Sequence, residues 1–184
     1  NTGATTEEIE ASKVIKYCAV NESSTGREVI IKLATEVNNT LKPLPVEVME
    51  AVDVYRRRTK GAGIPYRIIS YLPDKLKLNI RVFRDPLVIN ASGMDITSGR
   101  YPIQEALQEY MKELPFNGEL RLQDLANKLE AVTGVNLVSV DLAQSCWINA
   151  STNNYGDWTT IDVRRIPESG YFTIENYNDI RYEV

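Results

Sequence analysis

Few side chains in this sequence are suited to acid–base, nucleophilic or metal chemistry. The chain of 184 residues contains no histidine and two cysteines, Cys18 and Cys146, which lie far apart. Histidine is the usual general base near neutral pH and the commonest metal ligand, so its absence excludes Ser-His-Asp catalysis, Cys-His catalysis and histidine-based zinc sites. Two distant cysteines do not make a disulfide framework, and we interpret both as buried thiols, with a bridge between them as the alternative.

Carboxylates are the remaining route to catalysis or metal binding. Calcium and magnesium need clustered oxygen ligands, whereas the acids of the last third of the chain are scattered without EF-hand spacing: Asp141, Asp157, Asp162, Glu175 and Asp179. The glycine-rich patterns that hold phosphate groups are also absent. We therefore expect no catalytic residues, no metal and no cofactor, and we predict that the chain is not an enzyme. An enzyme would need two acids in one cleft, for example Asp141 with Asp157 or Asp162.

Two groups of side chains are candidates for an interaction surface. They are Arg56, Arg57, Arg58, Trp147, Tyr155 and Trp158. The three arginines form the strongest run of charge, although solvated cations at the end of a helix are an alternative interpretation. The three aromatic residues surround a polar loop over residues 149–156, where they either anchor an interface or pack at the end of a sheet.

The composition is that of an ordinary globular protein, with 43% hydrophobic and 25% charged residues. The 25 acidic residues outnumber the 21 basic ones, which gives a net charge of -4 and no general attraction to nucleic acid. No window approaches the roughly 20 apolar residues of a membrane-spanning helix. We expect no nucleic-acid partner and no membrane insertion.

The first part of the chain, residues 1–63, is predicted to be a helical segment. A first helix begins after Thr5 or Thr6 and continues to about residue 18, and a second covers residues 27–41 with apolar side chains at helical spacing. The run Val29-Ile30-Ile31 leaves a strand as the alternative for the second helix. A third helix covers residues 46–59, after Pro43 and Pro45, and ends in the three arginines.

The second part, residues 64–184, is predicted to be an α+β domain. Residues 75–84 alternate between apolar and polar side chains, which predicts a strand with one buried and one solvated face. Helices are expected over residues 102–114 and 122–132. Further strands are expected over 66–72, over 135–140 with a continuation toward Trp147, and over 158–163, 170–174 and 180–184. The resulting order predicts a β-α-α-β(β) domain, with helices packed on one face of a mixed or antiparallel sheet.

The stretch from Leu76 to Gly134 resembles the C-terminal region of the phage baseplate J-like proteins, which are wedge subunits of contractile tails and injection systems. The matching text is LNIRVF at 78–83, GRYPIQEALQEY at 99–110, LPFNGELRL at 114–122 and VTGV at 132–135. Residues 165–172, RIPESGYF, are similar to the C-terminal ending of that family. These are packing and turn positions, and they include no catalytic residue.

The resemblance implies a structural role without catalysis. The chain would be a wedge or scaffold subunit of a phage tail, a prophage or a contractile injection system, assembled in the bacterial cytoplasm and located in the virion or tail-like particle. Its partners would be other baseplate and tail proteins and copies of itself. The alternative is a small soluble binding module for an unknown ligand, with a pocket near Trp147 and Trp158.

Overall fold

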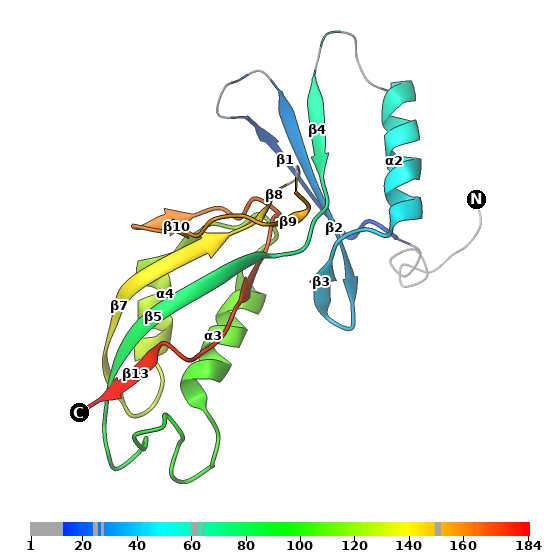
Figure 1. The fold of residues 1–184 in the computed structure, drawn as a ribbon. Coiled ribbons are helices and arrows are strands. Elements are labelled where there is room, and N and C mark those ends of the chain that lie inside the picture. The colour runs from blue at the N-terminus through cyan, green and yellow to red at the C-terminus, as the bar shows by residue number, and fades with distance from the viewer. Residues whose placement is uncertain (1–12, 24–25, 27, 60–62, 64, 150–151) are drawn as a thin grey trace. The chain divides into compact units, whose positions relative to one another are not determined.

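A computed structural model describes residues 13–23, 26, 28–59, 63, 65–149 and 152–184. The chain forms two units, Asn1–Pro73 and Asp74–Val184, each shown in Figure 1. The division lies later in the chain than the boundary expected between residues 63 and 64. Strand β4 (Tyr66–Ile69) explains the difference, because it pairs with a strand of the first unit.

The sheet of the first unit is centred on β2 (Val29–Val37). Antiparallel partners of β2 are β1 (Tyr17–Glu22) and β3 (Thr40–Lys42), while β4 runs parallel to it. A parallel pair needs a crossover connection, and the helix α2 (Val46–Thr59) supplies it between β3 and β4. Figure 1 shows α2 alongside this sheet.

Two of the three helices expected in residues 1–63 are wrong where the structure describes them. Residues 29–37 form β2 in place of the helix expected over 27–41, because the β-branched run Val29-Ile30-Ile31 fits a pleated sheet. The end of the first expected helix is β1, and its beginning lies outside the described residues. The third helix is confirmed over the predicted residues 46–59.

A tight turn makes this β conformation possible. Asn38 and Asn39 both have positive φ angles, 53° and 57°, and they join the paired residues Val37 and Thr40. Two left-handed residues between paired positions are the pattern of a type I′ hairpin turn. The chain reverses its direction at this turn, so residues 30–41 cannot form the continuous helix that the spacing of their apolar side chains suggested.

The sheet of the second unit is built on two long strands, β5 (Asp74–Arg84) and β7 (Val135–Cys146), which are antiparallel. On the other edge of β5, β12 (Phe172–Ile174) and β13 (Ile180–Glu183) pair with it in parallel, and β10 (Thr159–Thr160) pairs with β7. The sheet is thus mixed, and the predicted α+β class is confirmed.

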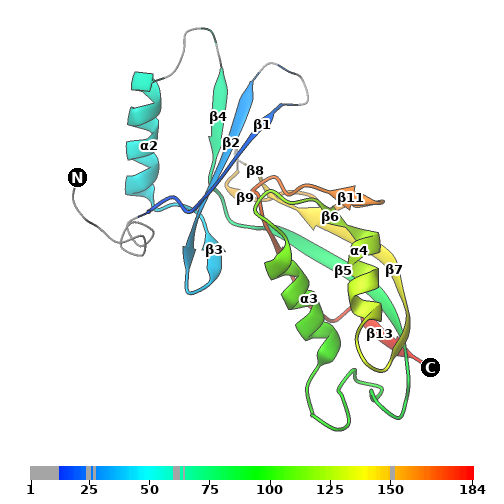
Figure 2. The ribbon, with the colours of Figure 1, turned by 180° about the vertical axis from the view of Figure 1, so that it is seen from behind.

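Both helices of the second unit cover one face of this sheet. Figure 2 shows α3 (Pro102–Glu113) and α4 (Leu122–Glu130) side by side against β5 and β7. Between helices and sheet lies the hydrophobic core, whose fully buried side chains include Leu76, Ile80, Ile103, Leu107, Leu125 and Leu129. Burial alternates along β5, as its sequence predicted, so its opposite face is left to solvent.

Short strand pairs complete the second unit. β6 (Leu120–Arg121) pairs with β11 (Arg164–Arg165), and β8 (Ile148–Asn149) forms a hairpin with β9 (Asn154–Tyr155). The strand expected over 158–163 is confirmed only over Thr159–Thr160, while residues 161–163 lie outside any strand. Its residues contribute β10 to one strand pair, and the chain then continues into β11 in another.

Candidate interaction surfaces

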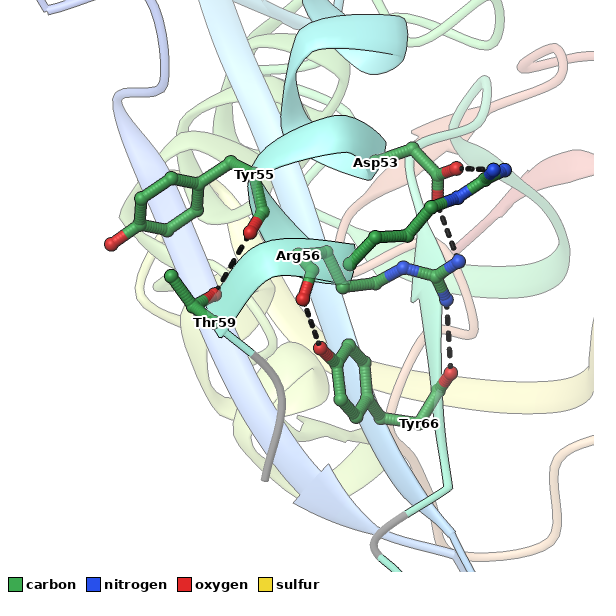
Figure 3. A network of polar contacts seen from close by, with 6 residues as sticks. Asp53, Tyr55, Arg56, Thr59 and Tyr66 are labelled. Atoms are coloured by element: carbon green, nitrogen blue, oxygen red, sulfur yellow. Dashed lines mark hydrogen bonds and ion pairs between the residues drawn. The ribbon is translucent and has the colours of Figure 1, made fainter. Parts of the chain in front are cut away.

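The run of three arginines lies at the end of α2, and its members have different surroundings. Arg56 lies against the sheet, where its guanidinium is 5.4 Å from the centre of the Tyr66 ring. Its Nη1 donates to the Tyr66 carbonyl oxygen at 3.5 Å, and the Tyr66 hydroxyl donates to the Arg56 carbonyl oxygen at 3.1 Å. Figure 3 shows this reciprocal contact between α2 and β4. Arg56 therefore fastens the helix to its own sheet.

The other two arginines take no part in the contact with Tyr66. Arg57 forms an ion pair with Asp53 at 2.7 Å, and Asp53 is also paired with Arg56. Arg58 is exposed and has no ion pair within the described part of the chain. Only Arg57 and Arg58 of the predicted run are therefore placed on the surface, and Arg58 alone keeps an uncompensated charge.

The predicted aromatic cluster is partly assembled by the β8–β9 hairpin. Tyr155 pairs with Ile148 in that hairpin, and the amide of Gly156 donates to the Trp147 carbonyl oxygen at 2.9 Å. Trp147 and Tyr155 are half-buried, while Trp158 is 38% exposed just before β10. The hairpin thus brings Trp147 and Tyr155 to one end of the sheet.

Lys75 of β5 connects this aromatic end to the solvated face of the sheet. Its ammonium lies 4.6 Å from the centre of the Tyr155 ring and 2.9 Å from a carboxylate oxygen of Glu175. The hydrogen bond to Glu175 raises the pKa of Lys75, and burial raises the pKa of Tyr155. Both groups therefore keep their protons at neutral pH, and neither is poised to act as a base.

The solvated face of the β5–β7 sheet carries paired charges. Arg81 donates two hydrogen bonds to Asp141, at 2.7 and 2.8 Å, and Ser139 donates a further one at 2.9 Å. The hydrogen bonds from Arg81 and Ser139 lower the pKa of Asp141. Lys77 pairs with Asp179 at 3.7 Å. The charges of this face are thus largely neutralised within the chain.

Apolar side chains lie beside these charged pairs. Leu137 is 52% exposed and Leu142 is 39% exposed, and both are on β7. By strand register Leu137 lies opposite Phe83 and Leu142 opposite Asn79, so they share the face of Arg81 and Lys77. We call the group Lys77, Arg81, Leu137, Asp141 and Leu142 the open sheet face.

A buried polar contact in the second unit was missed by sequence reasoning. Asp74 is 2% exposed and accepts hydrogen bonds from the Ser169 amide at 2.9 Å, the Ser169 hydroxyl at 2.7 Å and the Glu168 amide at 2.8 Å. Burial raises the pKa of Asp74, and the bonds from Ser169 and Glu168 oppose this effect. In sequence Asp74 follows Pro73 and has the pattern of a turn, so only the fold reveals its partners.

The acids proposed for an enzyme alternative have no catalytic geometry that the structure records. Asp141 is held by Arg81, and Asp157 and Asp162 are exposed. Among the described residues, no group of three or more acids or cysteines is arranged to hold a metal ion. Of the two cysteines, Cys146 is buried as expected, but Cys18 is exposed because it lies on the outward side of β1.

Within the described part of the chain, none of the helices is both long and apolar enough to cross a membrane. The chain matches neither a protein-family model nor a curated protein sequence.

Proposed function

We propose that this chain is a structural subunit of a phage-tail-like baseplate, which acts by protein–protein assembly and without catalysis. The observation that carries the proposal is the open sheet face, where exposed leucines lie among charges that are already paired. Interface centres are depleted of charged residues and rich in apolar contact. Pairing within the chain leaves this face little net charge, so it suits a protein partner better than nucleic acid.

The resemblance to baseplate J-like proteins adds to this proposal. Its matching residues lie in β5, in α3, in β6 with the turn before it, and in the turn between α4 and β7. β5, α3 and β6 all contribute side chains to the core of the second unit. A core with one face covered by helices leaves the opposite face for neighbours in an assembly. The neighbours would be other baseplate and tail proteins, in a virion or a related injection particle.

Expression of this chain together with the neighbouring genes tests the proposed function. We expect a stable complex in size-exclusion chromatography with light scattering, and we expect Leu142→Glu to weaken it at least about tenfold by placing a charge in the contact. Leu87→Glu is the matched control, because Leu87 is 84% exposed outside the open sheet face. The proposal is contradicted if the chain forms no complex with any of these gene products. It is also contradicted if Leu142→Glu and Leu87→Glu weaken the complex equally.

A second candidate is a small binding module. It is favoured by Trp158, a tryptophan 38% exposed beyond the hairpin that holds Trp147 and Tyr155. A ligand that stacks on this aromatic group would change its tryptophan fluorescence, and Trp158→Ala would abolish the change. A monomer that binds no neighbour but shows such a saturable response would favour this candidate over the baseplate subunit.

A further inference from the structure

Helix α2 has two faces of different character. Its half-buried side chains, among them Met49, Val52 and Arg56, face the sheet, as the contact between Arg56 and Tyr66 shows. Exposed on the opposite side are Glu47, Ala51, Val54 and Arg58, at intervals of four, three and four residues. Residues at this spacing form one line along a helix. We call these four residues the outer stripe.

The outer stripe is ordered by charge and size. An acid stands at its beginning and a base at its end, while a small residue and an exposed valine, 51% accessible, occupy the middle. Arg57 lies beside the stripe but is held by Asp53, whereas Glu47 and Arg58 form no ion pair within the described residues. Both terminal charges are therefore available to a partner.

This order is complementary to itself when the direction is reversed. In an antiparallel pair of outer stripes, each Glu47 lies opposite the other copy's Arg58, and each Ala51 lies opposite the other copy's Val54. The methyl group of alanine leaves room for the valine, so the helix axes can approach closely. A parallel pair would instead set Glu47 against Glu47 and Arg58 against Arg58, which is repulsive.

We propose that the outer stripe of α2 is a contact between two copies of this chain, packed antiparallel about a two-fold axis. A two-fold contact uses the same patch on both copies, so a self-complementary stripe is what such symmetry requires. One pair of helices of this length buries less than the roughly 1,200 Å² of a stable complex. The association is therefore weak between free chains and is strengthened where copies are held close together.

Charge exchange tests the contact in solution. Glu47→Arg gives a stripe with a base at both ends, and Arg58→Glu gives one with an acid at both ends. We expect each variant alone to associate at least about tenfold more weakly than the unaltered chain, because two attractive contacts become repulsive. An equal mixture restores association, since all terminal pairs are then opposite in charge. Sedimentation equilibrium at high protein concentration measures this, with circular dichroism to confirm folding.

Disulfide trapping tests whether the two α2 helices pack antiparallel, even where the two copies associate weakly. In a Cys18→Ser background, which removes the exposed native thiol, a Glu47→Cys chain is mixed with an Arg58→Cys chain and oxidised. The mixture should give a cross-linked dimer, and the remaining Glu47–Arg58 contact is intact in that pair. Either variant alone should cross-link little, because its two thiols lie about 16 Å apart along the antiparallel helices.

The outcomes separate this contact from the proposed function. Equal trapping in the mixture and in the single variants, or no trapping in any sample, overturns the α2 contact. A failure of the mixed charge variants to regain association also overturns it. The complex with neighbouring gene products depends on the open sheet face and is measured separately, so either proposal can fail while the other holds.

Discussion

Asp74 places a carboxyl group inside the second unit, where donors from Glu168 and Ser169 replace the water it would have outside. The group also holds the segment before β12 at the start of β5, across 95 residues of sequence. Hydrogen bonds to a carboxylate stabilise its charged form, and burial penalises that form. Burial is the larger effect here, because the pKa of Asp74 is raised.

The raised pKa of Asp74 makes the stability of the fold depend on pH. When the folded pKa exceeds the ordinary value of 3.8, the folded state holds the proton more tightly than the unfolded state. The stabilisation is complete below the ordinary value and is lost as the pH rises through the folded pKa. We expect the difference in unfolding free energy between the unaltered chain and Asp74→Asn to decrease over this range. Urea denaturation at several pH values measures it, and a difference that grows with pH would contradict it.

Gly93 is a position where both the backbone conformation and a neighbouring side chain require glycine. Its φ angle is +84°, and an added Cβ would lie 2.1 Å from Cζ of Tyr182. Burial raises the pKa of Tyr182 to about 12, which agrees with a ring enclosed beside this loop. Gly93→Ala should therefore lower the free energy of unfolding by about 2–4 kcal/mol, from backbone strain and overpacking.

Gly99→Ala is the matched control for this substitution. Gly99 also has a positive φ angle, +69°, but no heavy atom lies within 4 Å of its added Cβ. It should cost only the backbone strain, about 1 kcal/mol. Chemical denaturation of both variants measures the two costs, and equal costs would show that Tyr182 does not confine Gly93.

Elements of secondary structure were predictable where the local pattern and the tertiary environment agree. The alternation over residues 75–84 gave β5, and Pro102 with the helical spacing after it gave α3. Pro43 and Pro45 before α2 and the arginines at its end bounded that helix correctly. In each case the apolar side of the pattern is the side that packs.

The β2–β3 hairpin shows where local reasoning failed. Apolar residues 30, 33, 34 and 37 have helical spacing, yet Ile30, Leu33 and Ala34 also fit a central strand flanked on both sides. In β2 the successive residues Lys32, Leu33 and Ala34 are all buried, so burial does not alternate along the strand and its sequence does not separate helix from sheet. The deciding feature was the turn at Asn38-Asn39, whose backbone conformation the sequence pattern did not disclose.

The turn itself gives a prediction for this element. Asn-Gly is the preferred pair for a type I′ turn, because the second residue also needs a positive φ angle. Asn39→Gly should therefore raise the free energy of unfolding of the first unit by up to about 1 kcal/mol, whereas Asn39→Val should lower it by at least as much. Thermal unfolding of both variants measures this, and stabilisation by valine would exclude the turn.

The candidate interaction surfaces were predicted only as residue types. The run of arginines was found in the sequence, but the attachment of Arg56 to Tyr66 depends on a strand that was assigned to the other domain. The open sheet face joins Arg81 of β5 to Asp141 of β7, 60 residues apart. Strand register decides which residues become partners across a sheet. Register depends on the packing of the whole fold, so no short sequence motif reveals these partners.

At the scale of the whole molecule, the chain has two compact units. The main hydrophobic cluster lies entirely in the second unit and includes Leu76, Leu107, Leu125 and Ile161. A unit with its own core can fold alone. We expect residues 74–184, expressed alone, to show a cooperative unfolding transition and a near-ultraviolet circular dichroism spectrum with fixed aromatic side chains. A fragment without a cooperative transition would show that it needs the first unit.

The parallel pairing of β12 and β13 with β5 has a consequence for synthesis on the ribosome. β5 emerges first among the elements of the second unit, and the strands that cover its free edge emerge after all the others. During translation that edge is an unpaired row of amides and carbonyls, open to pairing with another nascent chain. A chain truncated after Gly170 would keep this edge exposed permanently, so it should accumulate as aggregates and not as a shortened folded protein.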